Sequence, residues 1–254
     1  MKISIITATF NSIKNIEDCV NSVRKQSYDN IEHIIVDGAS KDNTVPFLKS
    51  KFNKFTKIVS EEDNGIYDAM NKGVKLANGD LIAFLNSDDF YANDNVVAKI
   101  VNLFKNEPSI DACYSDLIYI DKVNILKTIR YLKSCEFKPG LFLKGWCPPH
   151  PTFIARRSVF KRYGDFDLNY PLASDFDLMM RFLEIHRIKS MYIPEVWVHM
   201  RIGGVTNKNL KNILQQNLEI LNSFKKNGLS LNVFRFFFNK IISRFNQFFV
   251  NTNI

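Results

Sequence analysis

Residues 81–89 read Leu81-Ile82-Ala83-Phe84-Leu85-Asn86-Ser87-Asp88-Asp89, an apolar run that ends in polar and acidic residues. A short apolar run of this kind predicts a buried strand. Ligands of open α/β sheets bind beyond the carboxyl ends of the strands, where Asp88 and Asp89 would lie. Adjacent carboxylates there lose hydration and repel each other, so they favour a compensating cation. The pair is therefore a candidate Mg²⁺ or Mn²⁺ site for a diphosphate substrate. The alternative is a solvated turn in which the two aspartates cap the next helix.

The first half of the chain alternates predicted strands and helices. The strands cover residues 3–6, 33–36, 57–59 and 81–85, and the helices cover 16–23 and 66–76. This alternation indicates a mostly parallel sheet with right-handed crossovers and helices on its faces. Strand-like segments at 153–157 and 191–198 and a helix-like segment at 176–186 indicate an α+β part packed on the same sheet. We therefore expect a Rossmann-like α/β fold with a mostly parallel, mixed sheet, followed by a C-terminal helical tail.

Size and cysteine content limit the class of protein. The 254 residues suffice for one sizeable core, and 46% hydrophobic and 24% charged residues are ordinary for a folded domain. The four cysteines lack the paired spacing of zinc or redox sites, so we expect reduced thiols. The apolar run near the first residue is too short for a signal peptide, and no apolar stretch reaches membrane-spanning length. These features predict a cytoplasmic protein.

The net charge of +8 comes mostly from the C-terminal tail. No acidic residue follows Glu219, whereas five basic ones do: Lys225, Lys226, Arg235, Lys240 and Arg244. Residues 229–250 also place leucine, isoleucine and phenylalanine at helical spacing. Such a helix favours an anionic membrane interface, and packing on the rest of the protein or on a second subunit is the alternative. Basic charge on an apolar aromatic helix, rather than on a broad polar face, disfavours nucleic-acid binding.

Further polar side chains fall where they could contact a nucleotide or a sugar. Asp37 follows the predicted strand at 33–36, where a carboxylate can accept hydrogen bonds from a base or from ribose hydroxyls. A simple turn is the alternative for Asp37. Asp68 and Asn71 share one face of the helix at 66–76, so they could reach a ribose or sugar, or only cap and decorate the helix.

The motifs of the chain occur in a recognisable order. The first half carries Thr7-Ala8-Thr9-Phe10-Asn11, Val36-Asp37-Gly38-Ala39-Ser40, Gly65-Ile66-Tyr67-Asp68-Ala69-Met70-Asn71 and Asn86-Ser87-Asp88-Asp89. The second half continues with His150-Pro151-Thr152-Phe153, Ala173-Ser174-Asp175-Phe176-Asp177 and the segment 199–206. The series resembles the successive motifs of family-two glycosyltransferases with the GT-A fold, of the bacterial polysaccharide biosynthesis type. Each motif alone is weak evidence, but their order and spacing over residues 2–206 are specific.

The resemblance implies a role for each matching position. The implied nucleotide-binding residues are Thr7, Thr9, Asn11, Asp37, Asp68, Asn71, Asn86 and Asp88. Asp89 is the expected direct ligand of Mn²⁺ or Mg²⁺, with Asp88 and His199 as further metal ligands. The family usually has aspartate where this chain has Asn86, and an amide adds no charge to the motif.

Asp175 is the expected general base, because family members commonly have Glu-Asp where this chain has Ser174-Asp175. An acceptor hydroxyl loses its proton as it attacks the anomeric carbon, and a carboxylate within hydrogen-bond reach can take that proton. A helix N-cap is the alternative for Asp175. Asp177 would point elsewhere and have a structural role. The candidate contacts with acceptor or phosphate are His150, Trp146 and Arg201.

Together these roles imply an inverting, metal-dependent glycosyltransferase that takes a sugar from a nucleotide donor, with UDP expected. The implied acceptor is a lipid-linked glycan at the inner face of a bacterial membrane, in polysaccharide, O-antigen or capsule assembly. Residues 1–115 would bind the donor, 116–206 would form the acceptor-binding and catalytic half of the same domain, and 207–254 would form C-terminal helices. A homo-oligomer is compatible with the sequence.

Two other functions stay open. A nucleotidyltransferase also combines an α/β sheet with paired carboxylates, but it usually needs a glycine-rich basic loop after the first strand, which residues 7–12 lack. A non-catalytic, membrane-associated scaffold that binds nucleotide-sugars is the second.

Overall fold

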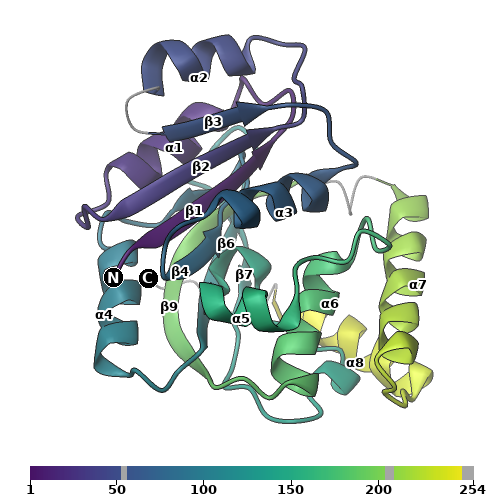
Figure 1. The fold of residues 1–254 in the computed structure, drawn as a ribbon. Helices are drawn as coiled ribbons and strands as arrows, with labels where there is room; N and C mark the ends of the chain where they lie inside the picture. The colour runs from purple at the N-terminus through teal and green to yellow at the C-terminus, as the bar shows by residue number, and fades with distance from the viewer. Residues whose placement is uncertain (53–55, 204–208, 248–254) are drawn as a thin grey trace.

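The computed structural model of the chain describes residues 1–52, 56–203 and 209–247 (Figure 1). Its centre is a nine-stranded sheet in which eight strands follow the order β3-β2-β1-β4-β8-β6-β9-β5, and β7 pairs with β6. The strands are β1 (Ile3–Thr9), β2 (Ile31–Asp37), β3 (Thr56–Ser60), β4 (Leu81–Phe84), β5 (Phe90–Tyr91), β6 (Ala112–Ile120), β7 (Thr128–Leu132), β8 (Ile154–Arg156) and β9 (Ser190–Arg201). The sheet is mixed, as the sequence predicts.

The parallel part of the sheet comes from the first half of the chain. β1 pairs in parallel with β2 and with β4, and β2 pairs in parallel with β3. β8 runs antiparallel between β4 and β6, and β9 returns parallel to β6. The strands of the second half therefore extend the same sheet. The carboxyl ends of β1 to β4 meet at one edge, which is where the acidic motifs lie.

Helices cover both faces of the sheet. They are α1 (Ile16–Arg24), α2 (Thr44–Phe52), α3 (Ile66–Leu76), α4 (Val96–Asn106), α5 (Arg157–Tyr163), α6 (Ser174–Met180), α7 (Leu210–Lys226) and α8 (Val233–Asn246), with short turns η1 (Phe142–Lys144) and η2 (His150–Thr152) and a π-helical turn η3 (Arg181–Ile185). Alternate residues of β1 point to opposite faces. Ile6 belongs to the core cluster that includes residues of α3, α6 and α8, whereas Ile5 belongs to the cluster that includes residues of α1 and α4. The predicted strands and helices are thus confirmed, with bounds shifted by a few residues.

α3 packs unusually close to β1. A Cβ on Gly73 would lie 2.3 Å from Cγ2 of Ile6, so a side chain at this position would push the helix off the sheet. The close approach fixes the first turn of α3, which carries Tyr67, near the carboxyl ends of β1 and β4.

The C-terminal helices lie beside α6, at the opposite end of the molecule from α2 (Figure 1). Phe236 of α8 is fully buried and makes an edge contact with Phe224 of α7. The other side of α8 exposes Val233, Phe234, Phe238, Ile241 and Ile242. One side of α8 thus packs on the rest of the protein, as one of the two alternatives expects, and contact of its exposed side with a membrane stays a prediction. No helix in the described ranges has the length and apolar character needed to cross a bilayer.

Candidate active site

The loop after β4 places its two aspartates differently. Asp89 is fully buried, and its Oδ atoms accept hydrogen bonds from the Asn86 side-chain amide (3.0 Å) and from the Arg201 backbone N–H (3.3 Å). Asp88 is half-buried, and its carboxylate makes no hydrogen bond with another described residue. Neither residue caps α4, whose N-cap is Asn95, so the capping alternative is wrong.

The pair is electrostatically unfavourable without a cation. Burial raises the pKa of Asp89 well above its usual range, and the charge of Asp88 raises it further. Burial also raises the pKa of Asp88, with Arg201 acting in the opposite direction. Two carboxylates that resist ionisation, one of them half-buried and without a hydrogen bond from another described residue, fit the oxygen-ligand chemistry of Mg²⁺ or Mn²⁺. The geometry favours Asp88 over the expected Asp89 as the ligand, because both oxygens of Asp89 already have donors.

Arg201 supports this loop from inside the protein. Its guanidinium donates to the Asp88 carbonyl oxygen (2.6 Å), pairs with Asp18 of α1 and lies 5.1 Å from the ring centroid of Phe90. Only 4% of the residue is exposed. Burial and these contacts engage both terminal nitrogens of the guanidinium, and a contact of Arg201 with phosphate stays a prediction.

His199 does not join the carboxylates in a three-ligand metal site. It lies opposite Phe90 in the β5–β9 pair, and the edge contact between the two rings has a centroid distance of 5.3 Å. Burial lowers its pKa, which keeps the imidazole neutral. Among residues 1–52, 56–203 and 209–247, no three His, Cys, Asp or Glu side chains gather around one point as metal ligands would. The expected grouping of His199 with Asp88 and Asp89 is thus not formed by these residues alone.

Asp37 lies at the end of β2 and is fully buried. One oxygen accepts from the Ser40 hydroxyl, and the other accepts from the Ser40 backbone N–H (2.9 Å) and from the Ser60 hydroxyl (2.7 Å). Asp37 therefore ties the ends of β2 and β3 together in this state. Its predicted contact with a base would require one of these hydroxyls to turn away.

The residues predicted for the nucleotide pocket in β1 and just after it are partly internal. Thr7 is fully buried, and its hydroxyl lies 3.0 Å from His33 Nε2 and in contact with Cys19. Thr9 is also buried, and its hydroxyl has no partner among the described atoms. Asn11 has a positive φ of 50°, and its side-chain oxygen accepts hydrogen bonds from the backbone N–H groups of Lys41 (2.9 Å) and Asp42. The side chain of Thr7 is thus not available to a nucleotide, whereas Asn11 shapes the loop at the sheet edge.

Asp68 and Asn71 both have structural partners. Asp68 accepts the Asn64 backbone N–H (3.0 Å) and lies 3.8 Å from Lys72, which orders the acidic loop before α3. Asn71 is buried, and its amide exchanges two 2.9 Å hydrogen bonds with the backbone of Phe166. Both polar atoms of the Asn71 side chain thus hold the segment before α6, and a position near the ribose or sugar stays a prediction.

Asp175 lies at the start of α6, and hydrogen bonds fix one of its two carboxylate oxygens. Its Oδ1 accepts hydrogen bonds from the Tyr67 hydroxyl (2.9 Å) and from the Phe176 N–H (2.8 Å). The N-cap of α6 is Ala173, so the N-cap alternative for Asp175 is wrong. No hydrogen bond from another described residue reaches Oδ2. One free carboxylate oxygen beside a fixed one is what a general base requires.

His150 links Asp175 to the β4 end of the sheet. Its ring stacks on Phe84, the last residue of β4, with centroids 5.4 Å apart, and meets the edge of Phe166. Burial lowers its pKa, and the charge of Asp175 opposes this effect. Its Nε2 atom is buried and has no partner among the described atoms. Phe84 also meets the edge of Phe166 (5.1 Å between ring centroids), and Phe166 stacks on Tyr67, which donates to Asp175. Asp175 therefore lies at the same edge of the sheet as the Asn86–Asp89 loop that follows Phe84.

Trp146 packs as part of an aromatic cluster. It makes edge contacts with Tyr114 (5.8 Å) and Phe142 (5.5 Å) and stacks on Phe137 (6.0 Å), measured between ring centroids. Trp146 therefore packs against the core cluster that includes Tyr114 and Phe142. A direct contact with an acceptor stays a prediction.

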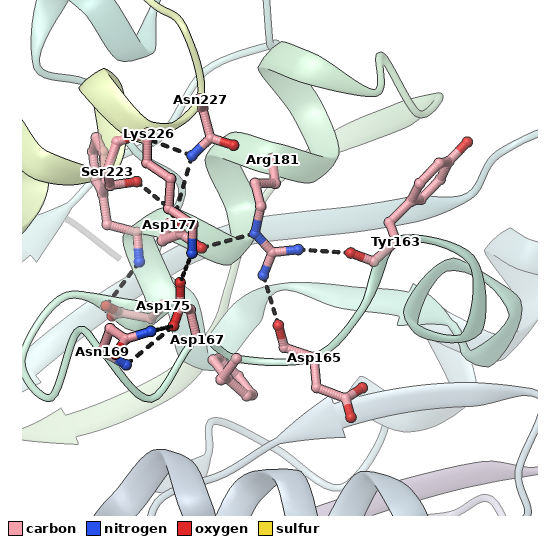
Figure 2. Close-up of polar contacts among 12 residues, drawn as sticks. Tyr163, Asp165, Asp167, Asn169, Asp175, Asp177, Arg181, Ser223, Lys226 and Asn227 are labelled. Carbon is pink, nitrogen blue, oxygen red and sulfur yellow. Dashed lines mark hydrogen bonds and ion pairs between the residues drawn. The ribbon is translucent and has the colours of Figure 1, made fainter.

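Asp177 has the structural role expected for it (Figure 2). Its carboxylate pairs with Arg181 Nε at 2.8 Å, and Arg181 also donates to the carbonyls of Tyr163 and Asp165. Ser223 of α7 donates to the other oxygen of Asp177 (2.5 Å). This network holds α6 between the 163–165 segment and α7, and so fixes the helix that carries Asp175.

Sequence reasoning missed two residues of the site. Tyr67 lies inside a recognised motif, but no spacing rule connects it with Asp175. Asp18 pairs with Arg201, which lies 183 positions further along the chain. No local pattern identifies such partners, because the contacts are made by the tertiary fold.

Comparison with known proteins places the chain among sugar-transferring enzymes. Residues 4–164 match the family model described as Glycosyl transferase family 2. An uncharacterized glycosyltransferase of Mycobacterium tuberculosis is 33% identical over 181 residues, which cover 70% of this chain and 68% of that protein. A PGL/p-HBAD biosynthesis glycosyltransferase of the same species is 29% identical over 209 residues, covering 80% of this chain and 78% of that protein.

Two solved structures share the fold. TarS of S. aureus, residues 1–349 in complex with UDP, superposes with a TM-score of 0.62 at 22% identity, over 87% of this chain and 66% of that one. The mannosyltransferase PcManGT of Pyrobaculum calidifontis, in complex with GDP-Man and Mn²⁺, superposes with a TM-score of 0.66 at 17% identity, over 95% of this chain and 69% of that one. At these identities the likeness concerns the fold.

Proposed function

The chain belongs to glycosyltransferase family 2 and has the GT-A fold, and on this premise we propose that it transfers a sugar from a nucleotide donor to an acceptor hydroxyl with inversion. The observation that carries the proposal is the placement of Asp175. A carboxylate with one oxygen fixed by Tyr67 and one left open lies at the same sheet edge as the Asn86–Asp89 loop. A single base opposite the leaving group suits direct displacement at the anomeric carbon.

The proposed chemistry assigns a step to each part of the site. Oδ2 of Asp175 accepts the proton of the acceptor hydroxyl as its oxygen attacks the sugar. Tyr67 holds the carboxylate in place through Oδ1. His150, neutral and with an unpartnered Nε2, is positioned to accept or donate one hydrogen bond to a hydroxyl of the sugar or acceptor.

The proposed binding of the nucleotide-sugar donor depends on the carboxylates of Asp88 and Asp89. Asp88 is the proposed protein ligand of Mn²⁺ or Mg²⁺, and the remaining ligands would be water and phosphate oxygens. A cation bound there would neutralise the negative charge on the departing nucleoside diphosphate. Asp89, buried and hydrogen-bonded, holds the loop. The complexes of two neighbours with UDP and with GDP-Man and Mn²⁺ support a nucleotide-sugar donor and a divalent cation.

We also propose that the acceptor is lipid-linked and that α8 lies on the membrane surface. The exposed apolar side chains of α8, the exposed Leu210, Leu214 and Leu218 of α7, and the lack of acidic residues after Glu219 support this placement. An apolar face flanked by basic residues suits an anionic bilayer surface. The division into a donor half (1–115), an acceptor half (116–206) and C-terminal helices (207–254) belongs to the same proposal.

Donor hydrolysis and binding test the central claim. The purified chain, incubated with Mn²⁺ and a panel of UDP- and GDP-sugars, is expected to hydrolyse at least one donor slowly, with water as acceptor. Asp175→Asn should lose this turnover while its affinity for the donor stays within about twofold, because the base is needed only in the transition state. Asp94→Asn, an exposed aspartate at the surface, is the matched control.

The alternatives predict other results. A non-catalytic scaffold would bind a donor and show no turnover in either protein. A nucleotidyltransferase would release pyrophosphate from a nucleoside triphosphate in the presence of a sugar phosphate. Either result, or equal turnover by wild type and Asp175→Asn, would contradict the proposed transfer.

A further inference from the structure

α8 carries one lysine on the side that packs against the protein. Lys240 lies one turn after the buried Phe236, and both face Gly145, the residue after η1. A Cβ on Gly145 would lie 3.0 Å from the Phe236 carbonyl oxygen and 3.3 Å from the backbone N of Lys240, and Gly145 has a positive φ of 80°. This close contact fixes Lys240 against the segment that runs on to Cys147 and His150.

The ammonium group of Lys240 is held by a neutral partner. It donates to Asn217 Oδ1 of α7 at 2.8 Å and lies 5.8 Å from the ring centroid of Phe236. Within the described part of the chain, no carboxylate lies within ion-pair distance of it. Burial lowers the pKa of Lys240 to about 8, and the nearby Arg244 adds to this effect. A cation that is partly desolvated without an anion is costly, so an anionic ligand would relieve a cost built into the fold.

Aromatic contacts connect the surroundings of Lys240 with the start of α6. Phe176, the residue after Asp175, makes edge contacts with Phe142 of η1 (5.4 Å) and with Phe224 of α7 (5.5 Å), measured between ring centroids. Phe224 in turn contacts Phe236, one turn before Lys240. The charge of Asp175 also raises the pKa of Lys240. Lys240 therefore lies on the side of α8 that packs toward the proposed base.

We propose that Lys240 is a phosphate-binding residue of the active site, which contacts a phosphate group of a substrate beside Asp175. This proposal rests on the proposed function, because the proposed function brings a phosphate-bearing substrate to the edge of the sheet where Asp175 lies. An ammonium suits phosphate as a point charge with three donors. The phosphate can belong to the diphosphate of the donor or to a phosphate-bearing lipid acceptor, since both present the same chemistry to the ammonium.

Binding measurements without turnover test the proposal and separate the two sources. Wild type, Lys240→Met, Lys240→Arg and the control Arg235→Met are titrated by calorimetry with UDP in the presence of Mn²⁺ and, separately, with geranyl phosphate. Lys240→Met removes the charge and keeps an apolar stem, whereas Arg235 is an exposed cation on the same helix. We expect Lys240→Met to weaken one ligand about tenfold, which is the size of one charge-assisted hydrogen bond, and Arg235→Met to leave both affinities unchanged.

Each result has one meaning. A loss confined to UDP assigns Lys240 to the diphosphate of the donor, and a loss confined to geranyl phosphate assigns it to the acceptor. Lys240→Arg, which keeps the charge, should bind within about threefold of wild type, and this separates charge from folding. Unchanged affinities in Lys240→Met, equal losses in Arg235→Met, or a wild type that binds neither ligand would each overturn the proposal. Because no sugar transfer is measured, a failure of the proposed transferase activity would leave these results standing.

Discussion

Tyr67 donates a 2.9 Å hydrogen bond from its hydroxyl to Oδ1 of Asp175, across 108 positions of the chain. Its ring stacks on Phe166 with centroids 5.3 Å apart, and Phe166 is held in turn by the amide of Asn71. Helix α3, packed tightly on β1 at Gly73, therefore sets the orientation of a carboxylate at the start of α6. Burial raises the pKa of Tyr67, and the charge of Asp175 raises it further, so the hydroxyl remains a donor.

Replacing this donor should slow turnover without weakening donor binding. Tyr67→Phe keeps the stacked ring and removes only the hydroxyl. We expect kcat to fall about tenfold or more, the size of a hydrogen bond to a charged group, while KM for the donor changes little. Steady-state kinetics of donor hydrolysis would measure both. Tyr163→Phe, whose ring stacks on His186, is the control and should behave as wild type. A Tyr67→Phe variant with unaltered kcat would show that Asp175 does not need this contact.

Asn71 should matter for stability and not for nucleotide affinity. Asn71→Ala removes two buried hydrogen bonds and leaves the N–H and C=O of Phe166 without these partners. We expect the free energy of unfolding to fall by about 2–4 kcal/mol, because each unsatisfied buried group costs about 1–3 kcal/mol. Urea denaturation would measure this loss, and a UDP titration at low temperature would show an affinity close to wild type. A large loss of UDP affinity in the folded variant would instead restore a ribose contact.

The two sides of α8 should respond oppositely to polar substitution. Phe234, Phe238 and Ile241 are 91%, 65% and 58% exposed, whereas Phe236 is 0% exposed. A triple change of the exposed residues to serine should weaken binding to phosphatidylglycerol vesicles at least about tenfold, since each apolar side chain contributes about 1.5–3 kcal/mol when fully buried, and should leave Tm unchanged. Vesicle co-sedimentation and thermal melting would measure the two effects.

Phe236→Ser is the matched control for that experiment. It should lower Tm strongly, because truncation of a buried phenylalanine costs about 3–5 kcal/mol. Vesicle binding by the triple variant equal to that of wild type would contradict the membrane placement of α8.

Lys240 should make stability depend on pH in the alkaline range. The groups that face it are Arg244 on its own helix, Asn217 on α7, and Cys147 and Asp175 across from it. Burial lowers its pKa from 10.5 to about 8, so between these values the unfolded chain binds a proton that the folded chain has released. The contribution of Lys240 to the free energy of unfolding therefore rises with pH from about 8 to about 10.5.

Lys240→Met removes this dependence. The difference in unfolding free energy between the variant and wild type should shift in favour of wild type as the pH rises through this range. Urea denaturation at pH 7, 9 and 10.5 would measure the shift, with Arg235→Met as a control that shows no comparable change. A constant difference between Lys240→Met and wild type would show that the lysine is not titrating near 8.

The sequence by itself determined the architecture and the position of the acidic motifs. Apolar runs of strand length separated by amphipathic helices decide the parallel half of the sheet, because periodicity reports which side of an element is buried. The carboxyl ends of neighbouring parallel strands lie at one edge, so the loop after β4 and the residue after β2 follow from strand order. The order of the motifs was also sufficient to indicate the family, which the comparisons confirm.

Only the tertiary structure decided which of these side chains remain available to a ligand. Asn71, Thr7 and Arg201 fall at motif positions, yet each finds its partners in a distant segment and is buried there. Local spacing fixes the direction of a side chain relative to its own helix or strand, but what lies opposite depends on how distant elements pack. The contact of Tyr67 with Asp175 and the approach of Lys240 arise in the same way, because burial pairs polar groups across elements that no short-range pattern connects.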